Sequence, residues 1–238
     1  LIRFAIFDMV ISSSSFSHPV KKLVNFTEQF QNGYSGYERF LEIMSIAPDI
    51  QDKPDALPLK NVQGEVTFEN VSFHYEESKE NVLSNVNLHV PAGDYVALVG
   101  SSGAGKTTLC SLIPRFYDAT KGEVLVDGVN VKEYTQKALR NKIGYVSQKA
   151  VLFTGSIKSN VAYGDNGTKG FTDDVVKQAI ETAQAKEFVD TKEGRLDAKI
   201  EQGGKNLSGG QRQRLTLARA LVPQSDILIM DDSASALD

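Results

Sequence analysis

The stretch Gly100–Thr107 reads Gly-Ser-Ser-Gly-Ala-Gly-Lys-Thr and decides the fold. It matches the pattern GxxxxGK[ST], in which glycines let backbone N–H groups converge on phosphate oxygens and the next helix adds the partial positive charge of its N-terminus. An apolar run at 95–99, expected to be a strand, precedes the loop, and a helix expected over 106–112 follows it. This strand–loop–helix order is the context that the pattern requires. The residues predicted to bind nucleotide here are Gly100, Ser101, Ser102, Gly103, Ala104, Gly105, Lys106, Thr107 and Thr108.

Two side chains of the loop have separate predicted roles. Lys106 is placed to pair with the β and γ phosphates, and the Thr107 hydroxyl is placed to ligate Mg²⁺. The other half of such a site is a buried strand that ends in a carboxylate, and the run Ile227–Asp231 fits it. Asp231 is therefore a second predicted Mg²⁺ ligand. Together these elements indicate binding of a nucleoside triphosphate, without choosing among a kinase, a GTPase and an ATPase.

The chain from residue 62 onward has the pattern of an α/β domain. Short alternating or apolar runs predict strands, and amphipathic runs predict helices between them. Such an alternation around a Gly-rich turn is typical of the α/β class. Besides those named above, the expected strands are 66–75, 86–90, 123–126, 143–146 and 227–230, and the expected helices are 173–185 and 209–221.

The region before this domain has a different composition. Residues 1–46 carry apolar side chains at helical spacing, but the serine run at 12–15 and Pro19 interrupt the pattern, so we expect a kinked helix. Residues 47–60 contain three prolines among acidic residues, which is typical of a linker. We therefore expect three parts: a helix over 1–46, a linker over 47–60 and a nucleotide-binding domain over 61–238.

Composition excludes several classes of protein. The 238 residues are 41% hydrophobic and 24% charged, which is typical of a globular chain and excludes a largely disordered one. A lone cysteine excludes an intrachain disulfide scaffold and fits a reducing compartment. The net charge of −4 gives no bulk positive field for nucleic acid, which is not expected as a partner.

The run Leu207–Arg214 reads Leu-Ser-Gly-Gly-Gln-Arg-Gln-Arg and resembles the signature of the ATP-binding cassette (ABC) family. Its serine and glycines open a predicted helix, which suits an anion, although an isolated motif of this kind could be an ordinary serine N-cap. The resemblance implies a P-loop NTPase fold of the ABC nucleotide-binding type, with ATP and Mg²⁺ as cofactors. It also implies that the signature acts on the nucleotide of a partner domain, through Ser208, Gly209, Gly210 and Gln211.

Further residues match the family by position. Tyr75, at the end of an expected strand, resembles the residue that stacks on adenine, the alternative being a structural strand-end tyrosine. Gln148 matches the glutamine that senses the γ-phosphate, ligates Mg²⁺ and lies in the loop contacting the transmembrane domain. Residues 235–238 match the loop that crosses to the partner. The resemblance implies Lys106, Gln148 and Asp232 as the catalytic residues.

Asp232 departs from the family, which usually has Glu at this position. The carboxylate is retracted by one methylene, and a misplacement of about 1 Å can cost roughly 10²-fold in rate. One interpretation is a slower site that works through a shifted water. We favour a degenerate site that holds ATP with little turnover, as in one half of the heterodimeric exporters, while the signature completes the partner's site. The Gln202–Gly204 run before the signature also departs from the commoner pattern of homodimeric exporters.

The segment 36–44 resembles the region where the last transmembrane helix of an exporter runs down to its cassette. We therefore expect a fragment of an ABC exporter in the cell membrane, with the nucleotide-binding domain on the cytoplasmic face. The family's switch histidine is expected beyond Asp238, so the fragment alone should be weakly active or inactive. The expected partners are a second half-transporter, a heterodimer being favoured over a homodimer, and both transmembrane domains. A soluble ABC protein of DNA repair or translation and a non-hydrolysing regulatory subunit are the alternatives; the cargo is not identified.

Overall fold

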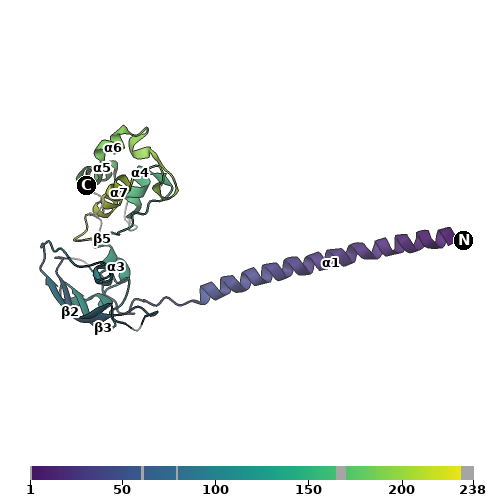
Figure 1. Ribbon diagram of the computed structural model, residues 1–238, viewed down its shortest axis with the longest axis horizontal. Coiled ribbons are helices and arrows are strands. Elements are labelled where there is room, and N and C mark those ends of the chain that lie inside the picture. Colours follow the sequence, from purple (N-terminus) through teal and green to yellow (C-terminus); the bar gives the residue numbers. More distant parts are fainter. Residues whose placement is uncertain (1, 60–61, 79, 165–169, 232–238) are drawn as a thin grey trace. The chain divides into compact units, whose positions relative to one another are not determined.

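The structure is a computed structural model of residues 1–238, and it describes all of them except 1, 60–61, 79, 165–169 and 232–238 (Figure 1). The side chains of residues 2–17 are also outside the description. The chain divides into two compact units, Leu1–Gln51 and Asp52–Asp238. The boundary between them falls inside the segment expected to be a linker.

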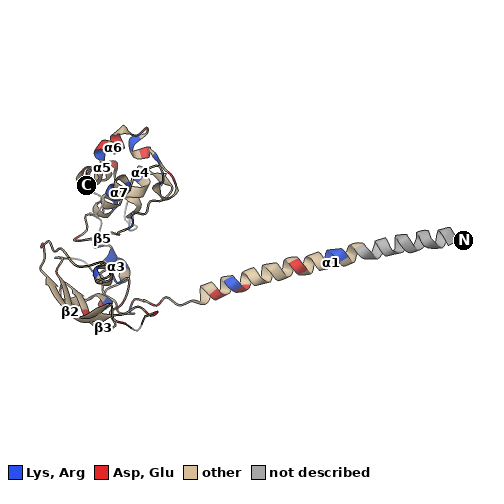
Figure 2. Ribbon diagram, viewed as in Figure 1, with Lys and Arg blue, Asp and Glu red and all other residues tan. Residues whose placement is uncertain are grey.

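The first unit consists mainly of one helix, α1 (Ile2–Ser45). The kink predicted at the serine run and Pro19 is wrong, because α1 continues through both and Figure 1 shows no sharp bend there. Pro19 lacks one backbone N–H, which is a single hydrogen bond in a helix of 44 residues. Figure 2 shows charges of both signs along the described part of α1 and over the helices of the second unit. Within the described part of the chain, no helix is long and apolar enough to cross a membrane.

The second unit contains a four-stranded antiparallel sheet. Its order is β2 (Leu83–Val90), β1 (Val66–Phe73), β3 (Lys121–Val126) and β4 (Val129–Asn130). Strand β1 buries Val66 and Phe68, then shifts phase and buries Val71 and Phe73. The shift comes from a bulge, because pairing with β2 and β3 is irregular between residues 68 and 72. An extra residue at this point returns the apolar side chains to the same face.

The bulge explains why a glycine lies opposite it. Asn70, within the bulge, has a φ of 50°. Gly122 has a φ of +76°, and a Cβ added there would lie 2.4 Å from the Asn70 carbonyl oxygen. No real Cβ tolerates such a contact, so this position requires glycine both for its backbone angle and for space.

A pair of parallel strands shares a hydrophobic core with this sheet. Strands β5 (Ile143–Val146) and β8 (Ile227–Met230) pair in register, Ile143 with Ile227 and Val146 with Met230. Helices α2 (Lys106–Leu112) and α3 (Gln136–Arg140) and the 3-10 turn η1 (Val131–Glu133) complete this part. The core that these elements share with the antiparallel sheet has as its most buried members Phe68, Val71, Leu112, Val126 and Leu139.

The remaining elements form a mainly helical part with its own hydrophobic core. They are α4 (Ile157–Val161), η2 (Ala162–Gly164), α5 (Asp173–Thr182), α6 (Lys186–Thr191), η3 (Arg195–Asp197), η4 (Gln202–Gly204), α7 (Gly209–Leu221), and the strand pair β6 (Gly155–Ser156) with β7 (Lys199–Ile200). Ile157, Val176 and Leu215 are fully buried in this core. Contacts between α7 and both α4 and α5 hold the helices together.

The α/β fold with a long N-terminal helix is confirmed, but one predicted strand is wrong. The structure has no strand at 95–99, and Tyr95 and Val99 are almost wholly exposed, at 102% and 94%. An apolar run has strand propensity, yet a strand exists only when a neighbour supplies its hydrogen bonds. No backbone hydrogen bond is made by residues 95–99 to a described strand. The expected helix over 173–185 ends earlier, at Thr182.

Candidate nucleotide site

The phosphate loop is shaped by two glycines with left-handed backbone angles. Gly103 has a φ of +80°, and Gly105, the residue before α2, has a φ of +88°. A Cβ on Gly105 would lie 2.8 Å from Cδ2 of Leu83, so β2 also closes the space on that side. Side chains at these two positions would strain the turn that feeds α2. The glycines therefore set the direction in which the helix N-terminus points.

Lys106, the first residue of α2, folds back over the loop. Its Nζ donates to the carbonyl oxygens of Gly100 and Ser101, each at 2.9 Å. Two carbonyls are weak partners for an ammonium compared with phosphate oxygens, because a charged acceptor makes the stronger hydrogen bond. The cation is thus already held at the mouth of the loop, where an anionic ligand can exchange for the carbonyls.

Thr107 and Asp231 meet as the sequence predicts. The Thr107 hydroxyl donates to Oδ1 of Asp231 at 2.7 Å. Asp231 follows β8 and is 6% exposed, and its backbone N–H donates to the Val146 carbonyl oxygen at 2.9 Å. Because β5 and β8 are parallel, Gln148 follows the same edge of the strand pair two residues after β5. The structure therefore brings the predicted Mg²⁺ ligands to one edge.

The donor set at this edge fits Mg²⁺. A hydroxyl, a carboxylate and an amide are hard oxygen donors, and Mg²⁺ takes few protein ligands because it keeps waters and binds substrate phosphates. Among the described residues, no group of three or more His, Cys, Asp and Glu could hold a metal on its own. The site thus suits a cation that arrives with a phosphate ligand.

Tyr75 lies against the same helix. Its hydroxyl lies 3.0 Å from the Thr108 hydroxyl, and Thr108 is the neighbour of the predicted Mg²⁺ ligand. The Tyr75 ring packs edge-on against Phe73 at 4.9 Å and against Tyr117 at 5.3 Å between centroids. The structure therefore places the predicted stacking residue beside the phosphate loop, although it follows a strand from another part of the chain.

The signature residues form the N-terminus of α7. Ser208 Oγ accepts from the Gln211 N–H at 3.2 Å, and Gln211 Oε1 accepts from the Ser208 N–H at 3.1 Å, which makes a reciprocal capping box. Ser208 and Gly209 are exposed, and Gly210 is half-buried. Ser208 therefore caps α7 in this conformation, and the exposed start of the helix is accessible to an anion. Leu207 of the signature belongs to the core of the helical part, whereas Leu109 and Leu112 of α2, the helix after the phosphate loop, belong to the other core.

The profile of one family, described as ABC transporter, matches residues 83–235. The chain belongs to the ABC transporter family. The matched region contains the phosphate loop, Gln148, the signature and Asp231.

Several ABC transporter proteins resemble the chain over most of its length. An uncharacterized ABC transporter ATP-binding protein, YwjA of Bacillus subtilis (strain 168), is 40% identical over 96% of this chain and 39% of its own length. The ATP-dependent lipid A-core flippase of Desulfotalea psychrophila is 41% identical over 92% of this chain and 38% of its own. The chain thus spans about two fifths of the length of these relatives.

The solved structure of a bacterial Atm1-family ABC exporter with ATP bound superposes with a TM-score of 0.81. It is 35% identical to this chain, and the match covers 87% of this chain and 36% of the exporter. The likeness supports both the fold and the assignment to the ABC transporter family.

Two half-buried groups near Asp231 have raised pKa values. Burial raises the pKa of the Cys110 thiol from 9.0 to about 11, with the negative charge of Asp231 adding to the shift and a backbone hydrogen bond opposing it. Burial also raises the pKa of Tyr145, and a hydrogen bond to Ser111 opposes that shift. Both groups therefore stay neutral near pH 7.

Some predicted residues lie outside the described part of the chain, and some residues beside the site were not predicted. Asp232 and the loop 235–238 lie outside the described residues, so the roles predicted for them stay predictions. Sequence reasoning missed Tyr117 and Arg140, which contact the aromatic residues beside α2. The aromatic pair Phe116–Tyr117, soon after α2, was the available signal for the first of these.

Proposed function

We propose that this chain is the ATP-binding and ATP-hydrolysing part of a membrane ABC exporter, which couples ATP-driven closure of two nucleotide-binding domains to export. The observation that carries the proposal is the Thr107–Asp231 hydrogen bond beneath a phosphate loop, in a chain that also bears an exposed ABC signature. Relatives named as lipid A-core flippases and as a putative multidrug export protein support export as the process. The cargo class stays open.

The reaction follows from what the loop can bind. The backbone N–H groups around Gly103–Lys106 and the Lys106 ammonium would hold the β and γ phosphates, and the positive end of α2 would stabilise their charge. Thr107, Asp231 and Gln148 would hold Mg²⁺, which when bound neutralises charge on the phosphates. Phosphoryl transfer needs alignment and charge stabilisation more than covalent help, so these residues can supply most of what it requires. Tyr75 would stack on the adenine ring.

We further propose that the chain's own site is degenerate and that its signature completes a second site on a partner half-transporter. The support is Asp232 in the place of the usual Glu, beside an intact signature at the exposed start of α7. In this arrangement Ser208 and Gly210 act on the partner's nucleotide, and the general base there comes from the other chain. The domain limits proposed are 1–46 for the helix that continues from the membrane, 47–60 for the linker and 61–238 for the cytoplasmic cassette.

ATP binding by the chain is tested directly. Titration calorimetry of the 238-residue chain with Mg·ATP should show binding to the natural sequence and none to the Lys106→Ala variant. A matched control is Lys137→Gln, which removes an exposed cation from α3 and should leave the affinity unchanged. Equal, weak heats from all three proteins would overturn the proposed function.

The degenerate site is tested in the assembled exporter. Changing Ser208 to Asp should abolish most ATPase activity, because it places a negative charge where the partner's γ-phosphate must bind. Asp232→Ala should reduce the activity much less. If the two losses are equal, or if Asp232→Ala is the more damaging change, this chain's own site is catalytic and the proposal of a degenerate site is wrong.

A further inference from the structure

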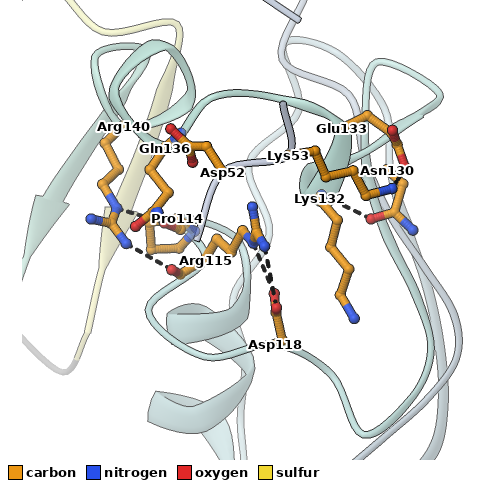
Figure 3. A network of polar contacts seen from close by, with 10 residues as sticks. All are labelled: Asp52, Lys53, Pro114, Arg115, Asp118, Asn130, Lys132, Glu133, Gln136 and Arg140. Carbon is orange, nitrogen blue, oxygen red and sulfur yellow. Dashed lines mark hydrogen bonds and ion pairs between the residues drawn. The ribbon is translucent and has the colours of Figure 1, made fainter. Parts of the chain in front are cut away.

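The segment Asp52–Leu57, named here the docked segment, is fixed to the nucleotide-binding unit at both of its ends. The Leu57 N–H donates to the Glu133 carbonyl oxygen at 2.7 Å, and the Thr135 N–H donates to the Leu57 carbonyl oxygen at 3.1 Å. At the other end, Asp52 Oδ1 accepts from the Gln136 N–H at 2.9 Å. An ion pair between Lys53 and Glu133 lies between these contacts (Figure 3). Only six residues, 46–51, separate the docked segment from the end of α1.

Asp52 acts on α3 in two ways. Its carboxylate satisfies the first N–H of the helix, one of those that have no partner within a helix. It also lies near Arg140, the last residue of α3, as Figure 3 shows. Partial desolvation lowers the pKa of Arg140, the Asp52 carboxylate opposes this shift, and the positive charge of Arg115 adds to it. The negative charge of Asp52 therefore favours the charged form of Arg140.

Arg140 in turn binds the chain just after the phosphate-loop helix. Its Nε donates to the Pro114 carbonyl oxygen at 3.0 Å, and an Nη donates to the Arg115 carbonyl oxygen at 2.8 Å. Its guanidinium also lies 5.3 Å from the centre of the Phe116 ring. These carbonyls follow the C-terminal end of α2, where a cation is stabilised by the helix dipole. Arg140 thus holds that end by two hydrogen bonds, which Figure 3 shows, and by one cation–π contact with Phe116.

The turn that Arg140 holds is connected to the nucleotide site in two ways, through α2 and through Tyr117. Helix α2 has seven residues and is about 10 Å long, with Lys106 and Thr107 at its other end. The turn also carries Tyr117, whose ring packs against Tyr75 at 5.3 Å. A displacement of this turn would therefore move both the phosphate-binding residues and the ring proposed to stack on adenine.

We propose that Arg140 is a positioning residue for the nucleotide site and that the docked segment controls it through Asp52. The proposal rests on the proposed function, since the ligand that would sense the positioning is a nucleoside triphosphate. In this proposal the docked segment, at the start of the nucleotide-binding unit and close after α1, influences the affinity for ATP. Two fixed elements, α2 and α3, and the ion pair of the buried Arg115 with the half-buried Asp118 would transmit it.

The test measures Mg·ATP affinity of the full 238-residue chain by titration calorimetry, for the natural sequence, Asp52→Asn, Arg140→Gln and the double variant. We expect Arg140→Gln to weaken binding roughly five- to tenfold, and Asp52→Asn to weaken it roughly two- to fivefold. Because Asp52 acts through Arg140, adding Asp52→Asn to Arg140→Gln should cause little further loss. Arg140→Lys restores one donor and the charge, so it should recover part of the affinity. Lys137→Gln, on the same helix, is the control and should bind as the natural sequence does.

A second measurement keeps the outcome independent of folding. Hydrogen exchange of the α2 amides without nucleotide should be faster in Arg140→Gln, while that of α5 and α7 stays unchanged. Unchanged affinity in Arg140→Gln, or additive losses in the double variant, would overturn the proposal. If the natural sequence fails to bind Mg·ATP, the proposed function fails instead, and the exchange measurement still decides whether Arg140 holds α2.

Discussion

The Thr107 hydroxyl donates a 2.7 Å hydrogen bond to the Asp231 carboxylate, across 124 positions of the sequence. Its proton is used in this bond, so the lone pairs of the hydroxyl oxygen stay available to a cation. The carboxylate is almost fully buried, and the hydrogen bond satisfies one of its oxygens. Helix α2 and the strand pair β5–β8 fix the two members of this pair, in an arrangement that suits the proposed Mg²⁺ site.

Thr107→Ala tests this arrangement. The change leaves the buried Asp231 carboxylate without its donor and removes one Mg²⁺ ligand. Removal even of a group that only supports a metal ligand typically costs about 10- to 100-fold in metal affinity, so affinity for Mg·ATP should fall by roughly 10- to 100-fold. Calorimetric titrations with and without Mg²⁺ check the result, since ATP alone should be affected much less. Thr107→Ser keeps the hydroxyl and is the control; an equal loss with and without Mg²⁺ would contradict a metal-binding role.

Tyr75 gives a prediction that separates base binding from phosphate binding. Stacking of a base on an aromatic ring is worth roughly 1–3 kcal/mol, so Tyr75→Ala should weaken ATP binding by about 5- to 100-fold. Tripolyphosphate lacks the base, and its affinity should change little in the same variant. Tyr75→Phe loses only the contact with the Thr108 hydroxyl and should bind ATP nearly normally. A parallel loss of tripolyphosphate binding would show that Tyr75 supports the loop and does not stack.

How far the sequence predicts this structure depends on whether the local sequence alone defines an element or whether the element also requires a distant partner. The bounds of α2 and β8 are predicted correctly, because a loop motif defines the start of one and an apolar run ending in Asp231 defines the other. The strand expected at 95–99 is wrong, because local preference for a strand does not supply a pairing neighbour. The Thr107–Asp231 contact was predictable only because the two motifs are known to belong together.

Contacts between residues that belong to no sequence motif could not be predicted. The hydrogen bond from the Gln136 N–H to Asp52 joins residues 84 positions apart, and neither residue belongs to a recognisable pattern. Arg140 lies on a helix of five residues, too short to show an apolar period. Its partners are backbone carbonyls, which every residue has, so the residue types at those positions do not reveal the contact. Interactions of this kind depend on how separate elements pack, and the amino-acid sequence alone does not state that packing.

Cys110 leads to a prediction about pH. With a pKa of about 11 in place of 9.0, the folded chain at pH 8 holds about 100-fold less thiolate than an unfolded one. Alkylation by iodoacetamide, followed by mass spectrometry, should therefore be slow in buffer and fast in urea. The raised pKa also means that its contribution to stability is complete below pH 9.0 and is lost as pH rises from 9.0 to about 11.

The Cys110→Ala variant isolates that contribution. Denaturant midpoints of the two proteins should run parallel below pH 9 and should diverge above it, with the natural sequence losing more stability. All other titrating groups are common to both proteins, so they cancel in the difference. Parallel curves up to pH 11 would mean that the thiol ionises normally in the folded chain.

Ser208 has a structural role in the capping box and a proposed role at the partner's nucleotide, and two variants separate them. Ser208→Ala removes the side chain that accepts from the Gln211 N–H, so the free energy of unfolding should fall by about 1 kcal/mol. Ser208→Asp keeps an N-cap acceptor and places a negative charge at the positive end of α7, so stability should be unchanged or slightly higher. The same charge would repel a γ-phosphate, so Ser208→Asp should be the more damaging change for the ATPase activity of the assembled exporter. Urea unfolding of the chain and ATPase assays of the exporter together check this opposite order. If activity instead follows stability, with Ser208→Ala the worse variant in both assays, the signature serine serves only to cap its helix.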